Sequence, residues 1–419
     1  LKILSCSRMP NQEIIRAQTT PEDGALFAKG LKNSKWVPSN HVAFTEDVRQ
    51  KGIIECGSVR TGTQIIIPFE KTCTLLEDVE IEIDLPALTP AGGATYIRYV
   101  DFVLLVLLQS IKWSYVANNV ATYNNVFTFC DIKKLCDEKR FNEYQLVGGN
   151  LSAAARNTFA TNPYRLRMRI PAPWNDKRYQ APVISALASK LTLTLDIASA
   201  SQIIQTDGTK PASLNFDANI VFQQIHFTGA TRQELTALTN TLNGLSYLID
   251  DIYTVDFDIP ANYFKATGNE FVAVLNDVDG PIHEMNLLIR TQDQLDPTNA
   301  NVGPYEIDPV YLDGLEYRIT SNNMDIQDPE SQNLDQLRKV QKFYRCIRRD
   351  TDQVIIIWKE FPEMDNCASG SVSFGNFTNP KLMIKNPKLA GAHPPLTLTV
   401  NYRRHNWDVH QRGTYQKVW

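Results

Sequence analysis

Length, composition and charge already exclude several classes of protein. At 419 residues the chain is long enough for about two or three domains, each with its own core, which excludes a mini-protein. An apolar content of 43% with 21% charged residues is ordinary for a folded protein and excludes wholesale disorder. The formal net charge of −4 offers nucleic acid no global attraction, so contact with DNA would need a local basic patch.

The first 57 residues have no sustained hydrophobic period and contain the turn signals "PEDG" and "VPSN". They predict an irregular arm that leads into the first strand. Because exposed apolar groups on an aperiodic tail seek a partner surface, we expect the arm to contact a neighbouring subunit or the interior of an assembly of copies, with packing on its own first domain as the alternative. The opening "LKILSC" is too short an apolar run for a secretory signal, so no export is expected.

Strict alternation of apolar and polar residues predicts a largely β protein. In "VEIEIDLP" (79–86), for example, the aliphatic side chains point one way and the three carboxylates point to water. The same period occurs in six further segments, at 164–171, 190–197, 218–227, 252–260, 353–361 and 395–402. The longest apolar run, "FVLLVLL" (102–108), is far short of the roughly 20 residues that span a bilayer and predicts a buried strand.

Helical patterns are few, and each follows a plausible N-cap. They cover 131–146, 231–242 and 331–347, and they are typical of excursions from a β framework.

A repeated order of segments, called the internal repeat below, indicates two similar β units in tandem. A helical excursion is followed by a strand that ends in proline, "RLRMRIPAPW" and later "IIIWKEFPEM", and then by "LTLTLDI" in one half and "LTLTVNY" in the other. Each half has enough strand candidates for an eight-stranded sandwich with long connections. The predicted fold is therefore all-β, with two tandem eight-stranded antiparallel jelly rolls. The domains are expected at 1–57 (arm), 58–248, 249–405 and 406–419 (tail), with the boundary between the rolls near 245–251.

Residues that could carry chemistry form no catalytic or cofactor motif. Nucleophile-elbow, zinc-protease, P-loop and dinucleotide-binding motifs are all missing, and Gly148–Gly149 precede no lysine-bearing helix start. His405 and His410 are five residues apart, a spacing that fits neither a helix face nor a zinc pair. Seven scattered cysteines without a C-x-x-C pair are typical of reduced structural thiols. We expect no metal and no cofactor, although a glycosidase pair among the many carboxylates is not excluded by sequence.

Two basic runs are candidate contacts. Arg165, Arg167 and Arg169 alternate on one strand, and a second group crowds the helix predicted at 331–347 and its exit: Arg338, Lys339, Lys342, Arg345, Arg348 and Arg349. Both runs could meet DNA or acidic surfaces of neighbouring subunits, and the second interpretation is favoured.

The order of these segments resembles the double jelly-roll major capsid proteins of large eukaryotic DNA viruses, virophages and polinton-like viruses, over roughly 60–405. "IEIDLPAL" (81–88), with Pro86, is similar to the family's turn after its first extended strand, and a long apolar strand pair follows at 99–119. "IPAPWNDKRY" (170–179), with Pro171 and Trp174, resembles the "PLPFWF" turn. "FTGATRQELTAL" (227–238) stands where the family has a short helix after the first roll and keeps Arg232 and Glu234.

The segment 361–377 is similar to a motif that closes the second roll of that family. The matching residues are Phe361, Pro362, Glu363, Ser369, Gly370, Ser371 and Phe374, whereas Ala368, Ser373 and Gly375 depart from the motif.

The resemblance implies a structural protein rather than an enzyme: a major capsid protein that forms pseudo-hexagonal homotrimeric capsomers in an icosahedral shell around DNA. It also implies location in the virion, assembly inside the host cell, and contacts with neighbouring capsomers and with minor capsid or cement proteins. A membrane or packaged DNA beneath the shell is a further possible partner. An internal assembly scaffold of the same fold and a carbohydrate-binding or glycoside-hydrolysing tandem sandwich are the alternatives.

Overall fold

The computed structural model describes most of the chain after the N-terminal 47 residues. The described residues are 48–71, 73, 75–116, 118–135, 147–149, 151–174, 183–227, 233, 236–237, 239–240, 245–265, 269–296, 302–322, 324–326, 355–359, 372–389, 391–411 and 414–417. No helix among them is long and apolar enough to cross a membrane.

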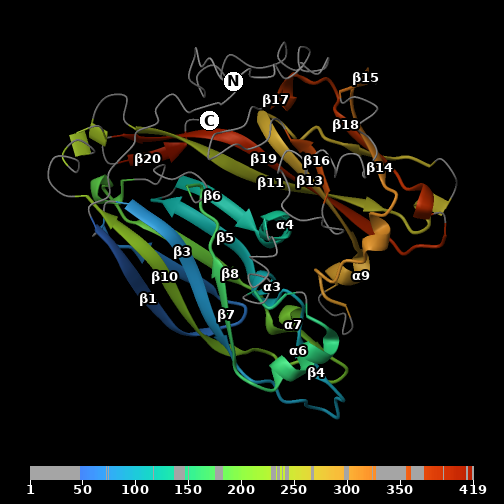
Figure 1. Ribbon diagram of the computed structural model, residues 1–419, viewed down its shortest axis with the longest axis horizontal. Coiled ribbons are helices and arrows are strands. Elements are labelled where there is room, and N and C mark those ends of the chain that lie inside the picture. The colour runs from blue at the N-terminus through green and yellow to red at the C-terminus, as the bar shows by residue number, and fades with distance from the viewer. Residues whose placement is uncertain are drawn as a thin grey trace, which may run out of the picture. The chain divides into compact units, whose positions relative to one another are not determined.

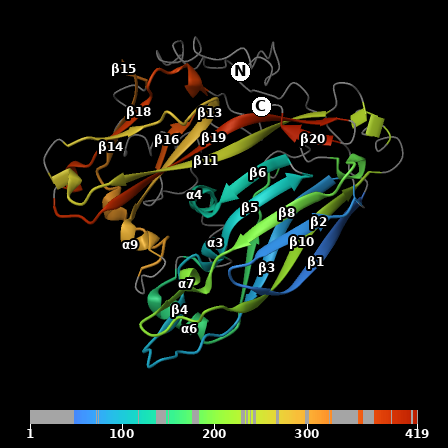
Figure 2. The ribbon, with the colours of Figure 1, turned by 180° about the vertical axis from the view of Figure 1, so that it is seen from behind.

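The first roll consists of two four-stranded antiparallel sheets. One sheet has the strand order β1 (Val48–Arg60), β10 (Asn215–His226), β3 (Leu75–Leu85) and β7 (Tyr164–Arg169) (Figure 1). The other has the order β2 (Gln64–Phe69), β8 (Leu191–Ile197), β5 (Leu108–Tyr115) and β6 (Asn118–Asn124) (Figure 2). β4 (Ile97–Tyr99) and β9 (Ile204–Thr206) form a separate two-stranded sheet.

The second roll repeats this arrangement. Its sheets have the orders β11 (Leu245–Ile259), β19 (Leu396–Gln411), β13 (Pro281–Thr291), β16 (Ile355–Lys359), and β12 (Phe271–Val274), β18 (Lys381–Lys385), β14 (Glu316–Ser321), β15 (Met324–Asp325). Two short strands extend the first of these sheets: β17 (Val372–Ser373) pairs with β13, and β20 (Thr414–Lys417) pairs with β19.

The two rolls have one topology. When the eight sheet-forming strands of each roll are counted in chain order, both rolls have the first, eighth, third and sixth strands in one sheet. The second, seventh, fourth and fifth strands form the other sheet in both. The predicted fold class of two eight-stranded jelly rolls is thereby confirmed.

Only half of the internal repeat in the sequence matches strands at equivalent positions of the two rolls. β7 and β16 are both the sixth strand of their rolls, as the repeat implies, whereas "LTLTLDI" is in β8, a seventh strand, and "LTLTVNY" is in β19, an eighth strand. The second match was wrong because alternation of Leu and Thr indicates only that the segment is a strand. It does not report which position in the sheet that strand takes.

The described residues divide into two compact units that exchange segments. One unit contains those of Val255–Ile289 and Pro309–His405, and the other contains those of Asn40–Thr254, Arg290–Asp308 and Asn406–Trp419. The segment after β13 is therefore grouped with the first roll. The domain limits expected from the sequence remain a prediction.

Alternation predicts the strands well because one face of each strand is buried. In β3, Val79, Ile81 and Ile83 are fully buried and Leu85 is 1% exposed. All seven segments in which alternation predicts a strand contain one: β3, β7, β8, β10, β11, β16 and β19.

Three sequence expectations are wrong in detail. The run 102–108 is buried but begins as a helix, α3 (Val103–Leu107), after Phe102 in a left-handed conformation (φ 53°), because a wholly apolar run has no period that separates helix from strand. The expected arm overlaps β1, where residues 48–57 pair with β10 and a register shift between Glu55 and Gly57 interrupts the alternation.

The helix expected at 131–146 begins earlier, as α4 (Asn125–Leu135), because the Asn124 side chain accepts the Phe127 N–H at 2.8 Å and caps it. Residues 136–146 and 331–347 lie outside the described residues, and those of 231–242 that are described are helical.

Candidate functional site

A buried polar cluster centred on Arg156 lies in the unit that contains the first roll. Arg156, on α6 (Ala153–Ala160), is 5% exposed and donates through Nη1 to Glu306 Oε1 at 2.6 Å and to Gln205 Oε1 at 3.2 Å. Gln205, on β9, donates to the same Glu306 oxygen at 2.9 Å, and the Gly303 N–H donates to it at 3.1 Å. One carboxylate oxygen thus accepts three hydrogen bonds from three segments of the chain.

Local structure brings these groups together. Ser152 caps α6 by accepting the Ala155 N–H at 3.2 Å, which fixes the first turn of the helix and the position of Arg156. A Cβ at Gly303 would lie 3.0 Å from Glu306 Oε1 and 3.4 Å from Val100 Cβ, so a larger residue there would require these neighbours to move. Gln294, on the short helix α9 (Gln292–Leu295) that follows β13, donates to the Glu306 carbonyl at 2.6 Å and holds the same loop.

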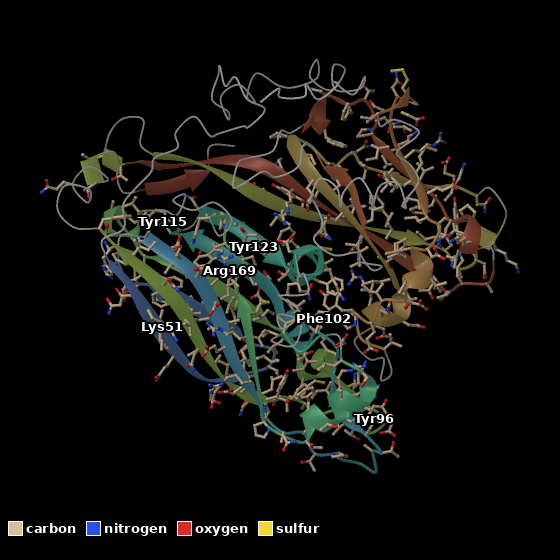
Figure 3. All side chains as sticks on the ribbon, in the orientation of Figure 1. Lys51, Tyr96, Phe102, Tyr115, Tyr123 and Arg169 are labelled. Carbon is tan, nitrogen blue, oxygen red and sulfur yellow. The ribbon has the colours of Figure 1, made fainter. Side chains whose placement is uncertain are left out.

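An aromatic and charged shell continues from this cluster. Lys133 Nζ lies 4.8 Å from the centroid of the Phe102 ring and 5.4 Å from that of Phe129, and Tyr305 stacks on Phe129 at 4.4 Å (Figure 3 labels Phe102). Asp101 is 8% exposed and its Oδ1 accepts the Leu151 N–H at 3.1 Å. Burial raises the pKa of the Asp101 carboxyl to about 6.

A carboxyl with a raised pKa beside a second carboxylate is the arrangement that acid–base catalysis uses. Here, however, Glu306 is engaged by Arg156, Gln205 and Gly303, and all three bonds hold the loop 302–308 in place. Asp101 fixes the backbone at Leu151 in the same way. The cluster is therefore best explained as a structural clamp between the first roll and the segment after β13.

Sequence reasoning did not find this clamp. Its one local signal is Arg156, the only charged residue in the helix "AAARNTFA", which points to a buried partner. Glu306 is 150 positions away, and no sequence spacing connects the two residues.

The arginines that alternate along β7 face carboxylates on β3 in the same sheet (Figure 3 labels Arg169). Arg165 forms two bonds with Asp84, Nε to Oδ1 at 2.6 Å and Nη2 to Oδ2 at 2.7 Å, and these bonds lower the pKa of the Asp84 carboxyl.

Arg167 pairs with Glu80, and Arg169 Nη2 lies 2.7 Å from Asp78 Oδ1. Each arginine thus has a carboxylate partner in its own sheet, and the interpretation of this run as a contact for DNA or for neighbouring subunits remains a prediction. The second basic run, at 338–349, lies outside the described residues.

Three of the residues that carry the family resemblance lie at the edge of the first roll's core. The carbonyl of Pro86 accepts the Tyr99 hydroxyl at 2.7 Å, and that of Pro171 accepts Trp113 Nε1–H at 2.8 Å. Trp174 is 2% exposed, and its ring centroid lies 4.9 Å from that of Trp113. These positions hold turns against buried aromatic rings, which gives them a structural role.

Of the residues that match the second motif, Phe374 is the one that the structure describes. It is 1% exposed, lies 5.1 Å from Phe377 between ring centroids, and donates its N–H to the Gly280 carbonyl at 3.0 Å. This contact continues the pairing of β17 with β13, and it gives the large apolar side chain in this segment of small residues a structural role. The remaining selected residues lie outside the described residues: Arg232, Glu234, Pro362, Glu363, Ser369 and Gly370.

His393 and Cys73 have structural surroundings. His393 is 5% exposed, and its ring nitrogens lie 3.1 Å from the Phe264 N–H donor and 2.8 Å from the Pro394 carbonyl. Burial raises the pKa of the Cys73 thiol to about 11, which keeps it protonated and unreactive. Among the described residues, no group of three or more His, Cys, Asp or Glu side chains could hold a metal ion.

The architecture resembles that of known protein structures. No protein-family model and no curated protein sequence matches the chain. Among solved structures, the chain resembles the PBCV-1 virus capsid, at 13% identity and a TM-score of 0.65, over 90% of this chain and 99% of that one.

It also resembles the Faustovirus major capsid protein, at 10% identity and a TM-score of 0.61, over 94% of this chain and 96% of that one. A third similar structure is that of the Sputnik virophage, at 12% identity and a TM-score of 0.52, over 95% and 92% of the two chains. The chain therefore has the double jelly-roll fold found in these viral capsid structures.

Proposed function

We propose that the chain is a major capsid protein that forms homotrimeric capsomers of pseudo-hexagonal outline, which tile an icosahedral shell around a DNA genome. The observation that carries this proposal is the pair of rolls with one strand order. It is supported by the coverage of 96% of the Faustovirus major capsid protein, since no large part of that protein lacks a counterpart here.

The geometry explains why two rolls are fused. Three chains with two similar rolls each present six similar wedges, and six wedges fit a hexagonal lattice. A closed three-fold ring needs heterologous contacts, in which different surfaces of two neighbouring copies meet. A capsid built from single rolls would need six chains to fill the same outline.

The clamp around Arg156 and the pairs along β7 favour a structural role without catalysis, because their charged groups are used to hold the chain's own segments. The partners in this proposal are other copies of the chain, neighbouring capsomers and minor capsid or cement proteins. Packaged DNA or an inner membrane lies beneath the shell. The site of action is the virion, after assembly inside the host cell.

The mass of the purified protein in solution tests the proposal. Light scattering should give three copies of the 47.4 kDa chain, about 142 kDa, at micromolar concentration. A monomer under these conditions would contradict it.

A further inference from the structure

The strand β12 has an open edge with unusual surface chemistry. Within the described residues its strand neighbour is β18, and β12 ends the sheet. Val272 is 41% exposed and Val274 is 43% exposed, whereas Ala273 between them is 1% exposed. Two aliphatic side chains therefore stand on the outer face of an edge strand.

The backbone of the same two valines faces the open edge. The Leu275 N–H donates to the Pro380 carbonyl at 2.9 Å, so Leu275 and Pro380 form a hydrogen-bonded pair. In an antiparallel ladder the residues between such pairs turn their N–H and C=O groups away from the partner strand, which here applies to Val272 and Val274. Proteins usually protect such an edge with a proline or a charge, and "FVAV" has neither.

The topological counterpart in the first roll, β2, also ends its sheet within the described residues. Ile66 on its outer face is 61% exposed. The Ile197 N–H donates to the Thr63 carbonyl at 2.9 Å, so the same alternation turns the N–H and C=O groups of Gln64 and Ile66 to the open edge. Pro68 follows in the same phase and, having no N–H, limits the length of strand that can pair there.

We propose that β12 of one copy pairs with β2 of a neighbouring copy as antiparallel strands, with Val274 opposite Gln64 and Val272 opposite Ile66. In this register the two hydrogen-bonded pairs use all four N–H groups that these residues turn to the open edges. Val272 and Ile66 then lie side by side on the outer face and remove each other from water.

Charges in the next strands fit the same register. Lys381 lies opposite Val274 on β18, and Asp196 lies opposite Gln64 on β8, where it accepts Gln64 Nε2–H at 2.7 Å. The paired copies would therefore have a lysine and a carboxylate at the two ends of one cross-strand row. These two charges would be about 14 Å apart, three strand spacings, which is longer than the Debye length at physiological salt, so they do not oppose the pairing but add little to it.

This inference rests on the proposed function. Each copy has one β12 edge and one β2 edge, so the pairing joins different surfaces of two neighbouring copies. Such a heterologous contact repeats from copy to copy and closes when the rotation between copies is three-fold.

Cross-linking tests the pairing directly. In an Ile66→Cys/Val272→Cys variant the two Cα atoms would be about 5.5 Å apart in a hydrogen-bonded pair, a distance that a disulfide bridges. Mild oxidation of the assembled protein should give covalent dimers and trimers on a non-reducing gel, and reductant should remove them. The matched control, Ile66→Cys/Met324→Cys, places the second thiol on β15 at the opposite end of the sheet, at a residue that is 71% exposed, and should give none.

The outcomes separate this inference from the proposed function. A trimeric wild-type protein whose Ile66→Cys/Val272→Cys variant gives no linked chains would overturn the pairing and leave the capsomer intact. A monomeric wild-type protein would refute the proposed function. If Val272→Cys alone links to a native cysteine, another segment covers β12 and the pairing is wrong.

A second variant measures the contribution of the edge to assembly. Val272→Lys/Val274→Lys places two charges on the outer face without changing the bonds to β18. It should keep the far-ultraviolet circular dichroism of the wild type and lose the trimer at micromolar concentration. A folded variant that remains trimeric would contradict the inference.

Discussion

Replacing Arg156 by methionine should destabilise the unit that contains the first roll. Methionine keeps much of the apolar volume of the arginine stem and removes the guanidinium that is 2.6 Å from Glu306. Glu306 keeps the hydrogen bonds from Gln205 and Gly303 but loses the only positive charge that contacts its carboxylate among the described residues.

The size of the effect follows from burial. Removing one partner of a buried ion pair costs about 3–5 kcal/mol, because the other charge stays buried without compensation. The Glu306 side chain is 24% exposed and keeps two donors, so the lower end, about 3 kcal/mol, is expected. At roughly 2–4 °C per kcal/mol for a unit of this size, the melting temperature should fall by about 6–12 °C.

Differential scanning calorimetry of wild type, Arg156→Met and a matched control, Arg165→Met, measures the change. Arg165 pairs with Asp84 at the surface, with 67% of its side chain exposed, and its replacement should leave the transition where it is. An Arg156→Met/Glu306→Met variant should recover part of the loss, since neither charge is then buried. Equal melting temperatures for Arg156→Met and the wild type would refute the clamp.

Three further predictions follow from other parts of the chain. The pKa of the Asp101 carboxyl is raised from 3.8 to about 6, so the folded protein keeps a proton that the unfolded chain has lost. The free energy of unfolding should therefore fall as pH rises from about 4 to about 6. In urea titrations, Asp101→Asn should remove this pH dependence and add up to about 2–3 kcal/mol of stability at pH 7. An unchanged pH dependence would contradict the assignment to Asp101. Gly148→Ala should cost about 1–3 kcal/mol because Gly148 has φ +73° and a Cβ there would lie 2.8 Å from Val103 Cγ1, whereas Gly391→Ala meets nothing within 4 Å and should be neutral in the same thermal assay. Deleting residues 1–45, which spares β1, should leave folding and trimers intact but prevent shells; normal shells would rule out a role of the arm in assembly, and failure to fold would favour its packing on the first roll.

Much of the fold could be predicted because period-2 alternation is a local signal. In β3 and β8, for example, the apolar residues are buried and the polar residues between them are half-buried. Where burial is complete the signal disappears, and for that reason the sequence predicts a strand where Val103–Leu107 forms a helix. The edge strand β1 escaped detection for the opposite reason, since most of its described residues are exposed or half-buried and a register shift changes its phase.

The contacts that define the sites were harder to predict because they are not local. Arg165, Arg167 and Arg169 were visible as a charged row, but their partners on β3 become apparent only when β7 is aligned beside it. The clamp joins residues 150 positions apart in sequence. Periodicity also could not distinguish the seventh strand of one roll from the eighth strand of the other, since both alternate leucine and threonine.

Electron microscopy of the purified chain tests the central claim most directly. Class averages viewed along the symmetry axis should show a three-fold particle with a pseudo-hexagonal outline, in which each of three chains contributes two similar β-sandwich densities. Averages that show single chains, or a ring whose symmetry is not three-fold, would contradict the account of this protein as the subunit of a trimeric capsomer.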